Sequence, residues 1–402
     1  MLKKDLGTIF LATLFCILVM YIVIYPNESF KASYDGMMLW FNVVLPALLP
    51  FFICVEILIG LGIVSFLGSC FRSIMRPIFN IPGEGSFAFF MSIASGYPVG
   101  AKITASLYEN NICNKIEAQR MLSLCSTSGP LFIIGAVATG ILGNPKLGLL
   151  LALSHYSSAI TAGFVMRFWS YSKQDKKALR IGSSSKINPL KEMLEFRKKD
   201  GRSFGILMGD AVKNGMNLIL MIGGFIILFS VITAVLKSSG LLDSFSKTIC
   251  AILPFLNLDP QAVASVIIGM LEVTNGIKEC AAVSMPHVYQ LMLVSFMIGF
   301  GGLSINAQVL SVIGKARLNF GLYCVMKLFQ GAVAAIYTYF MYSIIGVRQV
   351  FNIYDAINVS NYVKYLNSSP LDRILNSSLN LTLVLAVMLI FAFTFSMKKA
   401  KA

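Results

Sequence analysis

The sequence predicts an all-α, polytopic membrane protein that contains two repeats of inverted topology. Of its 402 residues, 56% are hydrophobic and 13% are charged, whereas soluble domains carry about 25% charged residues. The apolar residues form long runs, and residues 377–397 hold no charge over about the length that crosses a bilayer core. The net charge of +15 is typical of Lys and Arg retained in cytoplasmic loops. We therefore expect a lipid bilayer, and no nucleic acid, as the partner.

The reactive residue types indicate neither a cofactor nor a metal site. The eight cysteines are scattered, mostly in apolar stretches, and none forms a Cys-x-x-Cys pair. The two histidines cannot form a His-Glu-x-x-His site, and no phosphate-binding Gly-x-x-x-x-Gly-Lys-Ser/Thr loop is present. Ser95 and Lys102 lack the spacing of a known serine–lysine hydrolase. We expect no cofactor, no metal and no enzymatic activity.

The first element, residues 1–34, is predicted to be a transmembrane anchor. Lys3 and Lys4 precede an apolar run over 6–25 that is about as long as a span. The run ends without an Ala-x-Ala site, so it is a retained span and not a cleaved signal peptide. Its amino end is expected in the cytoplasm.

Charge places three later segments relative to the membrane. The loop 170–204 carries ten basic and four acidic residues, and the carboxyl end is also basic, so both are expected in the cytoplasm. Charges balance in the loop that opens the last segment, 347–402, which is expected outside before a C-terminal span. The segments 35–169 and 205–346 must then cross the membrane in opposite directions, as inverted repeats of transporters do.

Short motifs support the duplication. Residues 95–105 align with 271–281, which places Gly100 on Gly276 and Lys102 on Lys278. Downstream, 128–131 aligns with 300–303, and both stretches are followed by an apolar run, a glycine, a basic residue and a further span. Four elements recur in the same order, which favours a true duplication over chance similarity.

Each repeat is predicted to contain the same elements. A first full span (about 38–62 and about 212–236) precedes an amphipathic connector. Next come a pair of short helices broken at a glycine-rich motif, a span interrupted at a second motif, and a last full span. The total is about eight spans plus two re-entrant hairpins with broken helices.

The breaks define the candidate binding site. Glycine and proline interrupt helices, and backbone that is not helical at membrane depth must face protein or a water-filled cavity. Free amides at the helix ends attract anions. The expected substrate-binding residues are Ser95, Gly96, Tyr97, Gly100, Lys102, Ser126, Ser128, Gly129, Thr274, Asn275, Lys278, Gly301, Gly302, Ser304 and Asn306.

Two lysines specify the ligand that we expect. Lys102 and Lys278 follow equivalent breaks, so inverted repeats would place them opposite each other across a pseudo-two-fold axis. Such a pair suits a small substrate with two negative groups. The alternative is that glycine and proline only kink packed transmembrane helices.

Intramembrane ionisable residues are candidates for coupling. Glu272 lies at a hairpin tip and Glu56 inside the second span, and each is a candidate coupling-ion ligand or proton relay. Glu272 could instead pair with a lysine, and Glu56 could sit near a helix end. His155 is surrounded by hydroxyl side chains and is interpreted as a helix–helix hydrogen-bonding residue, with Lys327 near its repeat equivalent.

Four motifs carry a resemblance to a known family. They lie at 45–53, 83–91, 95–102 and 128–135, and the most specific is Gly-Tyr-Pro-Val-Gly-Ala-Lys at 96–102. Over nearly the full chain the sequence resembles the YlbJ (SpoVV) family of sporulation integral membrane proteins, which belongs with the nucleoside-recognition or gate domains. The resemblance implies transport of dipicolinate from the mother cell toward the forespore, in the outer forespore membrane of a sporulating bacterium.

Dipicolinate is a planar dianion, on whose ring Tyr97 or Phe132 could stack. Other members of the gate class carry nucleosides or iron, so a nucleoside or ion transporter is an alternative. A membrane scaffold that recruits the carrier through its basic loop is another. The sequence leaves room for a homo-oligomer.

Overall fold

The structure is a computed structural model that describes residues 2–170, 188–252, 258–314 and 316–366. Every regular element within these ranges is a helix, which confirms the all-α prediction. Five described helices are long and apolar enough to cross a membrane: Pro26–Gly60, Leu147–Met166, Phe204–Ser238, His287–Ser311 and Phe320–Ser343. The total of eight spans stays a prediction. The predicted C-terminal span at 377–397 and loop residues 171–187 lie outside the described ranges.

The chain divides into two units, residues 1–342 and 343–402. The site and both repeats' broken helices belong to the first unit. Helix α17 (Phe320–Leu366) contributes to both units. The stretch 347–366, which we expected in an external loop, is therefore helical.

The first repeat follows helix α1 (Leu2–Ile24) and begins earlier than predicted. Pro26 starts the next helix at its first position, where its missing amide hydrogen costs nothing. One 35-residue helix then runs from Pro26 to Gly60 and includes a π-helical stretch. The remaining elements of this repeat are α4 (Ile63–Phe79), α5 (Gly85–Ser95), α6 (Tyr97–Glu109), α7 (Lys115–Leu124), η2 (Phe132–Ile141) and α8 (Leu147–Met166).

The second repeat has the same order of elements. The described part of the basic loop contains α10 (Pro189–Asp200), whose Glu192 accepts hydrogen bonds from Ser69 and Arg72 of α4. The repeat then consists of α11 (Phe204–Ser238), α12 (Leu241–Ile252), α13 (Pro260–Leu271), α14 (Val273–Ala282), α15 (His287–Phe300), α16 (Gly302–Ile313) and the start of α17.

The helix boundaries agree with the predicted alignment. When Gly100 is placed on Gly276, the break between α5 and α6 at Gly96 falls on the break between α13 and α14 at Glu272. The long helices Pro26–Gly60 and α11 have the same length of 35 residues. Amphipathic helices α4 and α12 follow them in both repeats.

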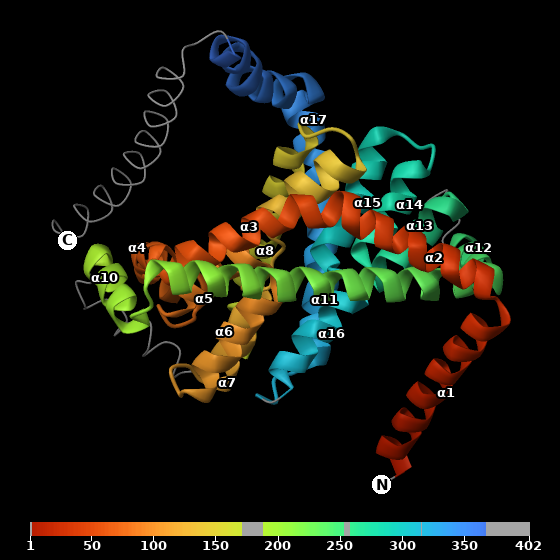
Figure 1. Cartoon of the computed structure of the whole chain (residues 1–402), viewed down its shortest axis with the longest axis horizontal. Helices are drawn as coiled ribbons and strands as arrows, with labels where there is room; N and C mark the ends of the chain where they lie inside the picture. Colours follow the sequence, from red (N-terminus) through yellow and green to blue (C-terminus); the bar gives the residue numbers. More distant parts are fainter. Residues whose placement is uncertain (1, 171–187, 253–257, 315, 367–402) are drawn as a thin grey trace. The chain divides into compact units, whose positions relative to one another are not determined.

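The two long helices lie side by side and run antiparallel (Figure 1). Gly36 contacts Ser230, whereas Gly60, at the other end of the first helix, contacts Leu207. Between these ends, Ile53 meets Gly215 and Trp40 meets Gly223. A two-fold rotation that exchanged the repeats would bring the Gly36–Ser230 contact close to the Ile53–Gly215 contact.

Small residues allow this close approach. A Cβ on Gly223 would lie 2.7 Å from the Trp40 indole, and the Trp40 Nε1 donates to the Ile219 carbonyl at 3.0 Å. A helix of 35 residues is about 52 Å long, longer than the roughly 30 Å of a hydrocarbon core. If the long helices cross a membrane, they are therefore tilted or extend beyond its core.

A core of buried side chains joins both repeats. Ala101 and Ala105 of α6 pack with Val309 and Ile313 of α16 and with Tyr323 of α17. These contacts bring the break at Gly96, which precedes α6, next to the break at Gly301, which precedes α16. The fold thus places all four helix breaks around one region.

Candidate functional site: a cavity between four helix breaks

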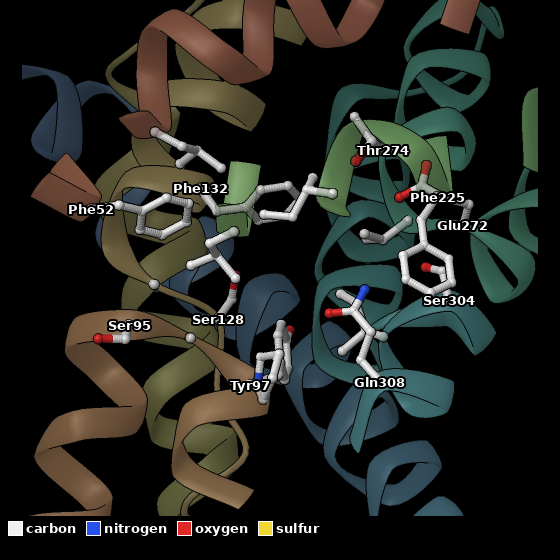
Figure 2. A pocket seen from close by; sticks show the side chains of 18 of the residues that line it. Phe52, Ser95, Tyr97, Ser128, Phe132, Phe225, Glu272, Thr274, Ser304 and Gln308 are labelled. Carbon is white, nitrogen blue, oxygen red and sulfur yellow. The ribbon is translucent and has the colours of Figure 1, made fainter. Parts of the chain in front are cut away.

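The helix breaks surround a cavity. Its empty volume is about 720 Å³, counting the part that opens to the outside. In Figure 2, residues of the first repeat form one side of it, namely Phe52, Ser95, Tyr97, Ser128 and Phe132, and residues of the second repeat face them, namely Phe225, Glu272, Thr274, Ser304 and Gln308. The cavity therefore lies between the two repeats.

Four helices begin at the cavity. They are α6, the helix that continues as η2, α14 and α16. Three of them are preceded by a glycine, Gly96, Gly129 or Gly301, which has no side chain to cap the amino end. The carboxylate of Glu272, by contrast, caps α14 by accepting from the Asn275 amide at 2.7 Å. Uncapped N-termini carry partial positive charge and free N–H donors. Three ends thus offer backbone groups to an anionic ligand.

Glycines permit the sharp breaks. Gly96, which separates α5 from α6, has φ +87°, and Gly301, which separates α15 from α16, has φ +83°. Residues with a Cβ rarely adopt this left-handed region. A Cβ on Gly301 would lie 3.6 Å from the Tyr97 ring, so this break also approaches the cavity wall closely.

Side chains satisfy the backbone of the break at 126–128. The Ser128 amide donates to His155 Nε2 at 2.9 Å, and the Tyr156 hydroxyl donates to the Ser128 carbonyl at 3.0 Å. Lys327 Nζ donates to the Ser126 carbonyl at 2.9 Å. The Thr127 amide donates to a serine hydroxyl of α5. This irregular backbone is therefore paired inside the protein, as membrane depth requires.

Aromatic and aliphatic side chains form most of the wall. The rings at the cavity are Phe51, Phe52, Tyr97, Phe132 and Phe225. Apart from Tyr97 and Phe132, these rings were not predicted, because a phenylalanine that lines a cavity and one that faces lipid look alike in an apolar span. A wall of rings suits a flat ligand.

The expected pair of cations is absent from the cavity, so that prediction was wrong. Lys102 and Lys278 are both exposed and do not line it. Lys102 lies five positions after Tyr97, which rotates it about 140° around the helix axis, away from the face that Tyr97 presents. Among the described lining residues there is no Lys, Arg or His, and Glu272 is the charged side chain at the wall.

The other predicted residues fall into two groups. Those that line the cavity are Ser95, Gly96, Tyr97, Ser128, Gly129, Glu272, Thr274 and Ser304. Those that do not are Glu56, Gly100, Ser126, Asn275, Gly301, Gly302 and Asn306.

Several residues of the second group have structural contacts instead. Glu56 accepts from Asn214 at 2.8 Å, on the pair of long helices. Gly100 packs against the Cys125 carbonyl, and the Ser126 hydroxyl bonds to Tyr323. Asn275 donates to Ser230 at 3.0 Å and so holds α14 on α11. Asn306 is buried.

Comparison with known proteins identifies first a class and then a family. Residues 41–145, which include all described residues of the first repeat that line the cavity, match the Gate family, described as nucleoside recognition. The chain is also 38% identical over 338 residues to the sporulation integral membrane protein YlbJ of Bacillus subtilis, covering 83% of this chain and 82% of that protein. The chain therefore belongs to the YlbJ family of sporulation integral membrane proteins.

A second relative covers a smaller region. An uncharacterized protein of Alkalihalophilus pseudofirmus is 28% identical over 110 residues, which is 27% of this chain and 22% of that protein. Together with the apolar helices, the family places the chain among integral membrane proteins.

Proposed function

We propose that this chain is a transporter that moves a small planar anion, dipicolinate, from the mother cell toward the forespore. It would lie in the outer forespore membrane with both termini in the cytoplasm. The proposal includes no enzymatic step. The substrate and the membrane are those that the family resemblance implies, and the cavity supplies the physical support.

The cavity between the four breaks carries the proposal. Dipicolinate is a flat ring with two carboxylates, and the wall combines aromatic rings with three uncapped helix N-termini. The carboxylates would accept hydrogen bonds from backbone amides. The ring would stack on Tyr97 or Phe132.

The arrangement of the repeats suggests how the cavity would open to each side in turn. Antiparallel long helices and matching breaks are the features of transporters with inverted repeats, in which one repeat rocks against the other around a central site. We therefore extend the proposal to alternating access between two inverted repeats.

Uptake by the purified chain in liposomes tests the proposal. We expect labelled dipicolinate to accumulate in proteoliposomes and not in empty liposomes. Phe132→Ala should reduce the rate about tenfold, since it removes a ring from the wall. The matched control is Phe340→Ala, because Phe340 is 52% exposed on α17; this variant should stay within about twofold of the parent.

A nucleoside is the second candidate substrate. The description of the matched Gate family, nucleoside recognition, favours it. Uptake of labelled uridine without uptake of dipicolinate would contradict dipicolinate as the substrate and support a nucleoside instead. Uptake of neither by folded protein would contradict transport by this chain alone and favour the scaffold alternative.

A further inference from the structure

Lys327 is a buried lysine directly behind the cavity wall. It lies on α17 and is 1% exposed. Among the described residues it has no carboxylate within ion-pair distance; its partners are Ser126, Gln330 and Tyr97. A permanent charge without a counter-ion is costly to bury, and ionisable groups at membrane depth mark functional sites.

The hydrogen bonds of Lys327 fit a neutral amine. Nζ donates to the Ser126 carbonyl at 2.9 Å and to Gln330 Oε1 at 2.6 Å. These two bonds use both N–H groups of a neutral amine and leave its lone pair free. An ammonium has a third N–H, for which the described structure offers no acceptor oxygen. The charged form would instead be stabilised by a cation–π interaction with the Tyr97 ring, whose centroid is 4.8 Å from Nζ.

Tyr97 separates this amine from the cavity. Its ring lines the cavity on one side and meets Lys327 on the other. Lys327 donates to the Ser126 carbonyl. Ser128 and Gly129, in the same break, line the cavity. A negative charge in the cavity would therefore act on Lys327 across one ring.

The other titratable groups around Lys327 are not acidic at neutral pH. They include Tyr97 of α6, His155 of α8 and Tyr323 of α17. His155 accepts the Ser128 amide through Nε2, so this nitrogen carries no proton. The carboxylate of Glu272 lies at the wall in the second repeat. An anion that enters the cavity would thus be the charge that shifts the equilibrium between the neutral and the protonated amine of Lys327.

We propose that Lys327 is a proton-binding site coupled to occupancy of the cavity by an anion. The inference rests on the proposed function. With the cavity empty, Nζ is a neutral amine. When an anion enters, the Nζ lone pair takes one proton from solution, and the resulting ammonium balances one negative charge of the substrate. On release of the anion, the proton leaves again, so each anion is carried with one proton.

Calorimetric titration of the purified full chain tests this coupling. Dipicolinate and its neutral diamide have the same ring and similar size, and titration in two buffers of different ionisation heat counts the protons taken up. For the parent protein we expect about one proton per dipicolinate and none for the diamide. In Lys327→Met, proton uptake should vanish and dipicolinate affinity fall about tenfold, while diamide affinity stays within about twofold. Lys102→Met, at an exposed lysine, should behave like the parent.

The outcomes separate the two proposals. Unchanged proton uptake in Lys327→Met, or equal loss of both ligands, would overturn the role of Lys327 and leave dipicolinate as a substrate. Equal loss would indicate that Lys327 only holds the 126–128 break in place. Failure of the parent protein to bind dipicolinate would overturn both proposals.

Discussion

Single residues at the breaks determine which charges reach the cavity. Three helices without a side-chain cap begin at the cavity, whereas the two exposed lysines that follow the breaks do not line it. A charge in bulk water is screened by solvent and salt and acts weakly over distance. Recognition of an anion would therefore depend on N–H groups and on Lys327 more than on Lys102 or Lys278.

We expect Lys102→Ala and Lys278→Ala to retain dipicolinate transport. Neither side chain lines the cavity, and both are exposed. Uptake rates in proteoliposomes should stay within about twofold of the parent. Loss of uptake in both variants, with the protein folded, would indicate that the two lysines take part in substrate binding after all.

Gly100 is expected to be required for stability. A Cβ at this position would clash with the Cys125 carbonyl and lie 2.6 Å from the Ser92 side chain. Gly100→Ala should destabilise the protein by about 1–3 kcal/mol, as overpacking does. Thermal unfolding in detergent measures the change. Gly209→Ala is the control, since a Cβ there would meet nothing within 4 Å beyond its own stretch of helix; a similar loss there would refute the packing explanation.

At the scale of helices, the sequence allowed the order of elements and the approximate position of each break to be predicted. In the second repeat the first break lies at Glu272, whereas the expected motif at 274–276 forms the first turn of α14. Gly96, Pro130 and Gly301 interrupt or start helices for local reasons, so the alignment of motifs located the breaks. The direction of Lys102 could not be predicted, because the phase of a helix after a break depends on the dihedral angles of the glycine. Most of the phenylalanines that line the cavity were not predicted, because hydropathy does not distinguish a side chain that lines a cavity from one that faces lipid.

The contact between the long helices predicts specific cross-links. Cysteine pairs at Gly36 with Ser230, and at Ile53 with Gly215, should form disulfides on mild oxidation, since both pairs are in contact. The pair Gly36 with Gly215 is the control. Its members are about 22 Å apart along the antiparallel helices, so cross-linking of this pair and not of the other two would indicate a different packing.

At the scale of the whole molecule, duplication would produce a site that neither repeat holds alone. Each repeat contributes two breaks to the cavity, and the long helices pack by an approximate two-fold relation. If the repeats are inserted in opposite directions, the loop 170–204 can lie in the cytoplasm, as its charge predicts, while both repeats face one site. The direction of insertion is the part of this arrangement that labelling can test.

Equivalent loops should lie on opposite sides of the membrane. Asn111, between α6 and α7, and Ser284, between α14 and α15, are both exposed. With the native cysteines replaced, an impermeant maleimide should modify Asn111→Cys from one side of sealed vesicles and Ser284→Cys from the other. Modification of both from the same side would show that the repeats are inserted in parallel.

Protection by substrate tests most directly whether one cavity, built by both repeats, binds the anion. Ser128→Cys and Thr274→Cys place a thiol at the wall in the first and second repeat, and Ser106→Cys places one on the exposed face of α6. In a cysteine-free background, dipicolinate should slow alkylation of the thiols at 128 and 274 over the same concentration range and leave 106 unaffected. Protection at only one of the two wall positions, or at neither, would contradict a shared binding cavity.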